Sequence, residues 1–268
     1  MNRRSFLAAS LVTAVAPSRA LGLAAGGGFV ALVTADLESH VVAVDVGSGR
    51  VVKRIRTVAG PRSIESSAFG YAVVAHTGHG IVSVLNSVTL SVRSVLGGFV
   101  EPRYTAMHSS ERLAYVTDSG RGDLVTLDLV RGTIVDRTPL GGPARHVSVD
   151  PGGRLLWTAL GTKAERVAVC DLGDPRRPRL QRVFEPPFLA HDVVCAPGGR
   201  HVWVTSGAGD TMAVYRLGGG TPRVLDDGVE SERPFALNRV VVLREREPET
   251  HRARVPKDSR DLVEGVLR

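Results

Sequence analysis

The chain contains 268 residues with a formal net charge of +7, and 43% of its residues are hydrophobic while 23% are charged. This balance supplies enough apolar side chain for a sizeable core and excludes wholesale disorder. The 30 glycines and 15 prolines favour many short strands joined by turns, and the two cysteines are too few for a disulfide-built fold.

Residues 1–25 have the composition of a secretory signal peptide. The pair Arg3-Arg4 precedes a short apolar run, Phe6 to Ala16, and small residues follow. The arginine pair with Ser5-Phe6-Leu7 resembles the twin-arginine export motif. We therefore expect an exported protein with an extracellular, periplasmic or cell-surface location; the alternative is an N-terminal amphipathic or buried helix. No later apolar run reaches 18 residues, so no membrane span is expected.

A repeat with a period of roughly 42 residues runs from residue 28 to residue 242. Each period opens with a short apolar run: Ala31–Thr34, Ala72–Ala75, Ala114–Thr117, Leu155–Thr158 and Val202–Thr205. A second run follows a turn and closes on a recurring polar residue: Asp45, Asn86, Asp128 and Asp171. Two further β-rich runs complete each period. Four short strands every 40 to 50 residues are typical of a β-propeller blade, so we expect an all-β propeller with about five repeats.

Tight turns punctuate the repeat. The segments Pro151-Gly152-Gly153-Arg154 and Pro197-Gly198-Gly199-Arg200 recur between the last run of one period and the first run of the next. Proline presets one turn dihedral and glycine adopts a positive one, which predicts a hairpin at both places.

The third period carries a resemblance to a known family. Ala114-Tyr115-Val116-Thr117-Asp118, followed by residues 122–129, resembles the YVTN family of β-propellers. The resemblance implies an exported or surface protein, mostly with seven blades and with poorly defined chemistry. Five repeats then indicate either a five-bladed ring or an incomplete seven-bladed one. A fold of this kind does not specify a function.

The last run of each period is expected to line the central channel, where loops at one end form a mouth. The corresponding positions in successive periods are Arg62, Arg103, Arg145, His191 and Asn238. With His146 beside Arg145, these residues predict a cationic mouth that binds a small anion, because arginine holds carboxylate or phosphate through paired hydrogen bonds. The alternative is that the arginines are solvated or pair with carboxylates of the blades.

The sequence predicts no metal site and no cofactor. Gluconolactonase-type propellers hold a divalent ion with carboxylate and amide side chains at inner positions, where this chain has Arg62, Arg103 and Arg145, whose charge would repel the ion. His76 and His79 lie in a segment that we interpret as a hairpin turn, with both side chains at the surface.

The sequence assigns no catalytic residue. It contains no Gly-x-Ser-x-Gly elbow, and His146 and His191 are the candidates for proton transfer because the ordinary pKa of histidine suits that task. We expect an exported binding or scaffold protein, for an anionic small molecule or a protein partner, that acts as a monomer. The alternative is a lactonase- or lyase-type enzyme. No basic stripe interleaved with aromatic residues indicates nucleic-acid binding.

Cys170 and Cys195 lie in strand-like runs and are expected to be buried thiols, with a disulfide between them as the alternative.

Residues 243–268 are rich in charge and fit no repeat, so they are expected to form an irregular tail or a short helix.

Overall fold

The structure, a computed structural model, describes residues 29–226. These residues form five antiparallel sheets, and a 3-10 turn at Thr77–His79 is the one helical element among them. The strands of the first sheet are β1 (Val30–Val33), β2 (His40–Asp45) and β3 (Val51–Arg56). The predicted signal peptide, Asn238 and the tail 243–268 lie outside the described residues.

The other four sheets have four strands each, in chain order. Those of the second sheet are β4 (Pro61–Ser66), β5 (Tyr71–His76), β6 (Ile81–Asn86) and β7 (Ser91–Leu96). Those of the third are β8 (Pro102–Met107), β9 (Leu113–Asp118), β10 (Asp123–Asp128) and β11 (Thr133–Pro139). Those of the fourth are β12 (Ala144–Val149), β13 (Leu155–Leu160), β14 (Arg166–Asp171) and β15 (Arg179–Phe184). Those of the fifth are β16 (Ala190–Cys195), β17 (His201–Ser206), β18 (Thr211–Arg216) and β19 (Arg223–Asp226).

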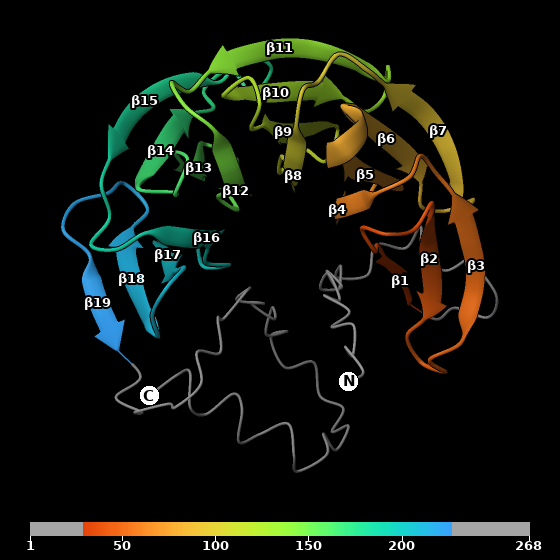
Figure 1. Cartoon of the computed structure of the whole chain (residues 1–268), viewed down its shortest axis with the longest axis horizontal. Coiled ribbons are helices and arrows are strands. Elements are labelled where there is room, and N and C mark those ends of the chain that lie inside the picture. The colour runs from red at the N-terminus through yellow and green to blue at the C-terminus, as the bar shows by residue number, and fades with distance from the viewer. Residues whose placement is uncertain (1–28, 227–268) are drawn as a thin grey trace, which may run out of the picture.

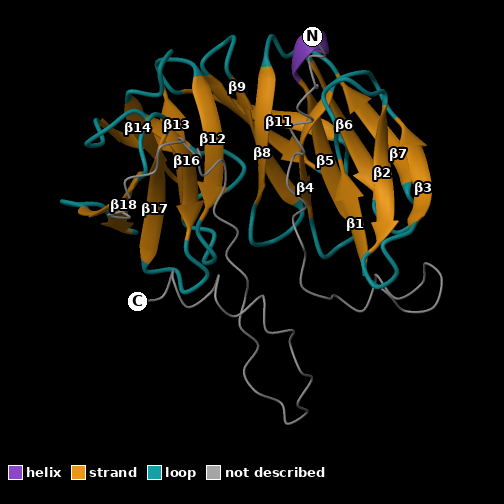
Figure 2. Ribbon diagram, turned by 60° about the horizontal axis from the view of Figure 1, so that its bottom comes forward, coloured by secondary structure: helices purple, strands orange, loops and turns teal. Residues whose placement is uncertain are grey.

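The sheets stand side by side around a common centre (Figure 1). Strands β4, β8, β12 and β16 face the centre and each packs against the next, while β3, β7, β11, β15 and β19 form the outer rim. The strands of all sheets run between the same two ends of the molecule, where the loops collect (Figure 2). This arrangement confirms the predicted β-propeller, with four strands in four sheets. In the first sheet the described residues provide no strand at the inner position, and the described blades form an open arc (Figure 1).

The middle strands of each blade are buried on both faces because a blade has a neighbour on either side. Along β5, Val73 packs into the cluster shared with the third sheet, while Val74 packs into the cluster shared with the first sheet. Both side chains are fully buried. Burying a valine side chain stabilises the fold by about 1.5–3 kcal/mol, so these strands explain the Val/Ala-rich character of the repeat.

The recurring polar residue of the repeat closes the turn that follows the third strand of a blade. The Oδ1 atom of Asp45 accepts a hydrogen bond from the Ser48 amide at 2.7 Å, and that of Asp128 accepts one from the Arg131 amide at 2.9 Å. Asn86 and Asp171 make the same kind of bond. A short carboxylate or amide that bonds its own backbone a few residues later builds a turn, so local turn chemistry accounts for this repeat position.

The strand pairing also corrects one repeat boundary. Leu155 pairs with Asp171, as Tyr71 pairs with Asn86 and Leu113 with Asp128. The fourth copy of the opening run is therefore 156–159, one residue later than predicted, because the match of Thr158 to Thr117 followed residue identity rather than register. The predicted hairpin glycines are confirmed, with a positive φ of 67° at Gly153 and 64° at Gly199.

Both cysteines are buried and free, which confirms buried thiols over a disulfide in this structure. Burial raises the pKa of each thiol to about 12, so neither is a reactive thiolate near neutral pH. Among residues 29–226, no helix has the length and apolar character needed to cross a membrane.

Candidate functional site

Each of the four inner strands has a bulge in its first half. The pairing register shifts between Pro61 and Ser63 in β4 and between Pro102 and Thr105 in β8. The same shift occurs between Ala144 and Val147 in β12 and between Ala190 and Val193 in β16. A bulge interrupts the strict alternation of side chains and re-aims the residues in it. The predicted channel positions fall in these bulges.

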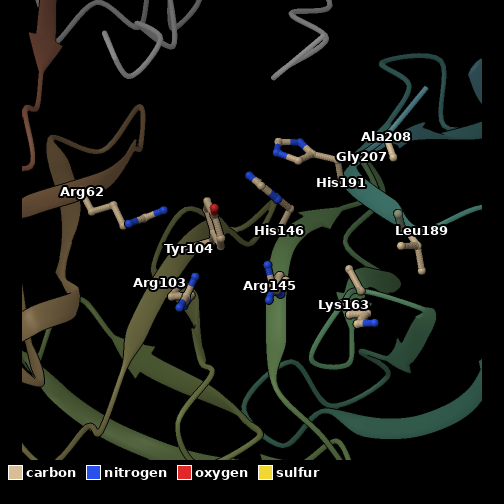
Figure 3. A pocket seen from close by; sticks show the side chains of 12 residues that line it. Arg62, Arg103, Tyr104, Arg145, His146, Lys163, Leu189, His191, Gly207 and Ala208 are labelled. Carbon is tan, nitrogen blue, oxygen red and sulfur yellow. The ribbon is translucent and has the colours of Figure 1, made fainter. Parts of the chain in front are cut away.

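The bulges bring the predicted residues to one cavity of about 300 Å³ (Figure 3). The predicted residues that line it are Arg62, Arg103, Arg145, His146 and His191. The structure adds Tyr104 from β8 and Lys163 from the loop between β13 and β14, and neither was predicted as a site residue. The size is at the lower end of the range for ligand pockets.

The lining contains four permanent cations and no carboxylate. Nearby carboxylates neutralise part of this positive charge: Arg62 Nη1 lies 3.5 Å from Asp36 Oδ2, and Arg103 pairs with Glu101. Both partners are partly exposed, and such pairs are worth about 0–1 kcal/mol. Arg62 and Arg103 therefore agree in part with the alternative prediction, in which the arginines pair with carboxylates of the blades. The third, Arg145, donates to the Thr162 carbonyl, and its charge acts on Glu165 at longer range.

Three rings from successive inner strands form a stacked series, which we call the ring series: Tyr104, His146 and His191. The centroids of Tyr104 and His146 are 3.7 Å apart, with an angle of 33° between the ring planes. Those of His146 and His191 are 4.8 Å apart, at 38°. In Figure 3 the series runs above Arg103 and Arg145. Tyr104 and His146 occupy the same position of the repeat, the second residue of each bulge. His191 is the first residue of its bulge, and no sequence signal reveals that it completes the series.

The protonation of the pocket is set by burial and by its arginines. Burial, and then the positive charge of Arg145, lower the pKa of His191 from its ordinary value. His191 is therefore neutral at pH 7 and provides one hydrogen-bond donor and one acceptor.

Among the buried polar atoms of the pocket residues, His191 Nδ1 and Arg103 Nε have no hydrogen-bond partner within residues 29–226. A buried donor or acceptor left unsatisfied costs about 1–3 kcal/mol. Such unsatisfied atoms are unusual in a folded protein, and they set these residues apart from an ordinary solvated surface.

Of the two histidines that the sequence places in a surface turn, His76 differs from the prediction. His76 ends β5 and is fully buried, with Nε2 2.9 Å from Ser83 Oγ and Nδ1 3.2 Å from the Ala59 carbonyl. His76 is a hydrogen-bonded core residue because β5 continues to this residue and the turn begins only at Thr77, whereas the nearby glycines predict a turn that already includes His76. His79 lies in the exposed 3-10 turn, as predicted. In the described part of the chain, no three His, Cys, Asp or Glu side chains group in a way that could hold a metal ion.

No family model and no curated protein matches the chain. Among solved structures, hydrazine synthase from Kuenenia stuttgartiensis superposes with a TM-score of 0.62 at 17% identity, covering 73% of this chain and 61% of that one. A functionally unknown protein from Desulfotomaculum acetoxidans superposes with a TM-score of 0.64 at 15% identity, covering 74% and 65%. The chain thus spans less than two thirds of the length of either. At these identities the likeness concerns architecture alone, and it shows that residues 29–226 have a β-propeller fold.

Proposed function

We propose that this protein is an exported, non-enzymatic β-propeller that binds a small anionic molecule in the pocket between its inner strands. The observation that carries the proposal is the convergence of Arg62, Arg103 and Arg145, from three successive blades, on one cavity without a lining carboxylate. Cations confined in a cleft attract anions, and a guanidinium binds a carboxylate or phosphate through two parallel hydrogen bonds.

Arg145 is the central residue of this proposal. Its neighbours Arg62 and Arg103 already have carboxylates beside them, whereas its own bond goes to a neutral carbonyl. A ligand anion therefore adds a direct ion pair for Arg145, whose charge already acts on Glu165 at longer range, and a further negative partner for Arg103. Export is supported by the composition of residues 1–25.

Calorimetric titration of the full chain with inorganic phosphate and with succinate tests the proposal. We expect binding of at least one anion, weakened about tenfold or more by Arg145→Gln. Arg54→Gln is the matched control because Arg54 is exposed on the outer strand β3, so its loss should leave the affinity unchanged. Absence of binding at millimolar anion, or equal effects of the two variants, would contradict the proposal.

A second candidate function is supported by His191. Its neutral ring has a buried nitrogen without a partner in the described residues, and it lies within the electrostatic reach of Arg145. A neutral imidazole can act as a general base, and a neighbouring cation stabilises the negative charge that forms on the substrate when a proton is removed. Lactonases and lyases use a base in this way. In that case, His191→Asn and His146→Gln should each abolish turnover of a lactone panel while the near-ultraviolet circular dichroism stays native. Turnover retained in both variants would exclude this function.

A further inference from the structure

We propose that the ligand of this pocket carries a flat aromatic ring next to its anionic group, as in an aryl phosphate or aryl carboxylate, and that this ring stacks at the His191 end of the ring series. The inference rests on the proposed anion binding and specifies the second half of the ligand.

The first support is the ring series itself. Its members come from three separate sheets, yet neighbouring centroids lie only 3.7 Å and 4.8 Å apart. Aromatic side chains at such distances attract one another beyond the effect of buried area alone. A series built from successive strands offers a ready-made stacking surface for one more planar group, much as aromatic platforms accept bases of nucleic acids.

The second support is the character of the wall around His191. The neighbouring lining residues are Leu189, Ala190, Gly207 and Ala208, and Figure 3 shows Leu189, Gly207 and Ala208 on the far side of His191 from Tyr104. Their side chains offer no hydroxyl, amide or carboxylate. A polyhydroxylated anion would lose hydrogen bonds to water against such a wall, whereas the edge of an aromatic ring would not.

The third support is the short distance between the cationic and aromatic parts. Arg145 and His146 are consecutive residues in the bulge of β12, so the guanidinium groups and the ring series share one cavity. The influence of Arg145 on the pKa of His191 shows that its charge is felt at the end of the series. Because His191 is neutral at pH 7, stacking on it does not require removal of water from a charged ring.

The test compares two monoesters with the same anionic group, phenyl phosphate and methyl phosphate, by calorimetry on the full chain at pH 7.5. We expect phenyl phosphate to bind about tenfold more tightly, equivalent to about 1.4 kcal/mol. His191→Ala should reduce this preference to less than about threefold, whereas His191→Phe should retain it. Arg145→Gln should weaken both esters by the same factor.

A second variant covers the case in which His191→Ala does not fold. Gly207 has no positive φ, and a Cβ there would meet only ordinary contacts, with the His191 Cβ at 3.7 Å and the Leu189 carbonyl oxygen at 3.5 Å. Gly207→Val therefore adds bulk beside His191 at a position where the Cβ itself is accommodated, and we expect it to lower the affinity for phenyl phosphate more than that for methyl phosphate.

The outcomes separate the two proposals. Equal affinities for the two esters, both weakened by Arg145→Gln, overturn the aromatic inference and leave anion binding in place. A phenyl preference that survives both His191→Ala and Gly207→Val overturns the assignment of the ring to His191. If neither ester nor any other anion binds, the proposed function itself is wrong.

Discussion

Tyr104 and His146 stack with their ring centroids 3.7 Å apart although they belong to different sheets. They occupy the same position in consecutive repeats, so the contact is a direct product of the propeller geometry: equivalent bulges in adjacent inner strands place equivalent side chains together. The pair links β8 to β12 at the level of the pocket and leaves His191 to extend the series.

Replacing Tyr104 tests whether this contact supports the pocket. Tyr104→Leu keeps apolar volume but removes the ring, and we expect the free energy of unfolding to fall by about 0.5–1.5 kcal/mol, the usual worth of an aromatic pair. Urea denaturation at pH 7.5 measures this. Tyr71→Leu, which also removes a partly buried tyrosine ring but at a site distant from the ring series, serves as the comparison for general loss of packing. An unchanged affinity for anions in Tyr104→Leu would show that the ring series is not needed for binding.

The stability of the described fold should fall as the pH drops below about 6.5. Burial lowers the pKa of both His76 and His191 in the folded state, whereas the unfolded chain titrates near the ordinary value of about 6.5. Below that value the unfolded state binds protons that the folded state does not, so the free energy of unfolding decreases with decreasing pH.

Urea midpoints at pH 7.5 and 5.5 measure this effect, and that range lies above the titration of most carboxylates. His191→Gln should reduce the difference between the two midpoints because one of the two groups is gone. His201→Gln is the control, since His201 is exposed at the start of β17. A difference that is identical in wild type and His191→Gln would show that burial of His191 does not contribute.

Asp128 should be the most sensitive of the recurring turn residues. It is almost fully buried, it accepts hydrogen bonds from the Arg131 amide, and Arg176 Nη1 reaches its Oδ2 at 3.0 Å. Asp128→Ala removes all of these, and we expect it to cost about 1–3 kcal/mol of unfolding free energy. Asp171→Ala is the matched control, since Asp171 is exposed and bonds one amide. Thermal unfolding of both variants should rank them in this order, and the reverse order would refute the argument.

Gly122 should not tolerate a side chain. Its φ is +73°, and a Cβ there would lie 2.8 Å from the Gly142 carbonyl oxygen. Gly122→Ala therefore combines left-handed strain with a backbone clash and should cost several kcal/mol, against about 1 kcal/mol for strain alone. Gly141→Ala isolates the strain, because Gly141 has a φ of +78° but no atom near its Cβ position. Equal melting temperatures for the two variants would contradict the role of the clash.

The sequence predicts most of this fold because its periods share landmarks: the opening apolar run recurs in five periods, the closing Asp or Asn in four and the Pro-Gly-Gly-Arg turn in two. The alternating apolar runs, the recurring Asp or Asn and the Gly-Gly turns are local signals, and the structure uses each of them locally. The pocket positions at Arg62, Arg103 and Arg145 were also predictable, since a repeat places equivalent residues around one axis.

Other features depend on contacts that no local pattern encodes. The burial of His76 follows from a hydrogen bond to Ser83 across the hairpin, and its Gly-rich surroundings suggest a surface turn instead. The role of Tyr104 depends on His146 in the next sheet. The register error at Thr158 arose because a matching residue type outweighed the cross-strand pairing, which only the structure fixes.

The bulges of the inner strands separate the residues that maintain the blade from the residues that line the pocket. Outside the bulge, the pairing of each inner strand with its neighbour fixes which side chains enter the core, and a change there disturbs the blade. The residues skipped in the register are exempt from this pairing, and their identity varies from blade to blade: Arg62 in β4, Arg103-Tyr104 in β8, Arg145-His146 in β12 and His191-Asp192 in β16. A propeller of this design can exchange its ligand chemistry one blade at a time while its core stays the same.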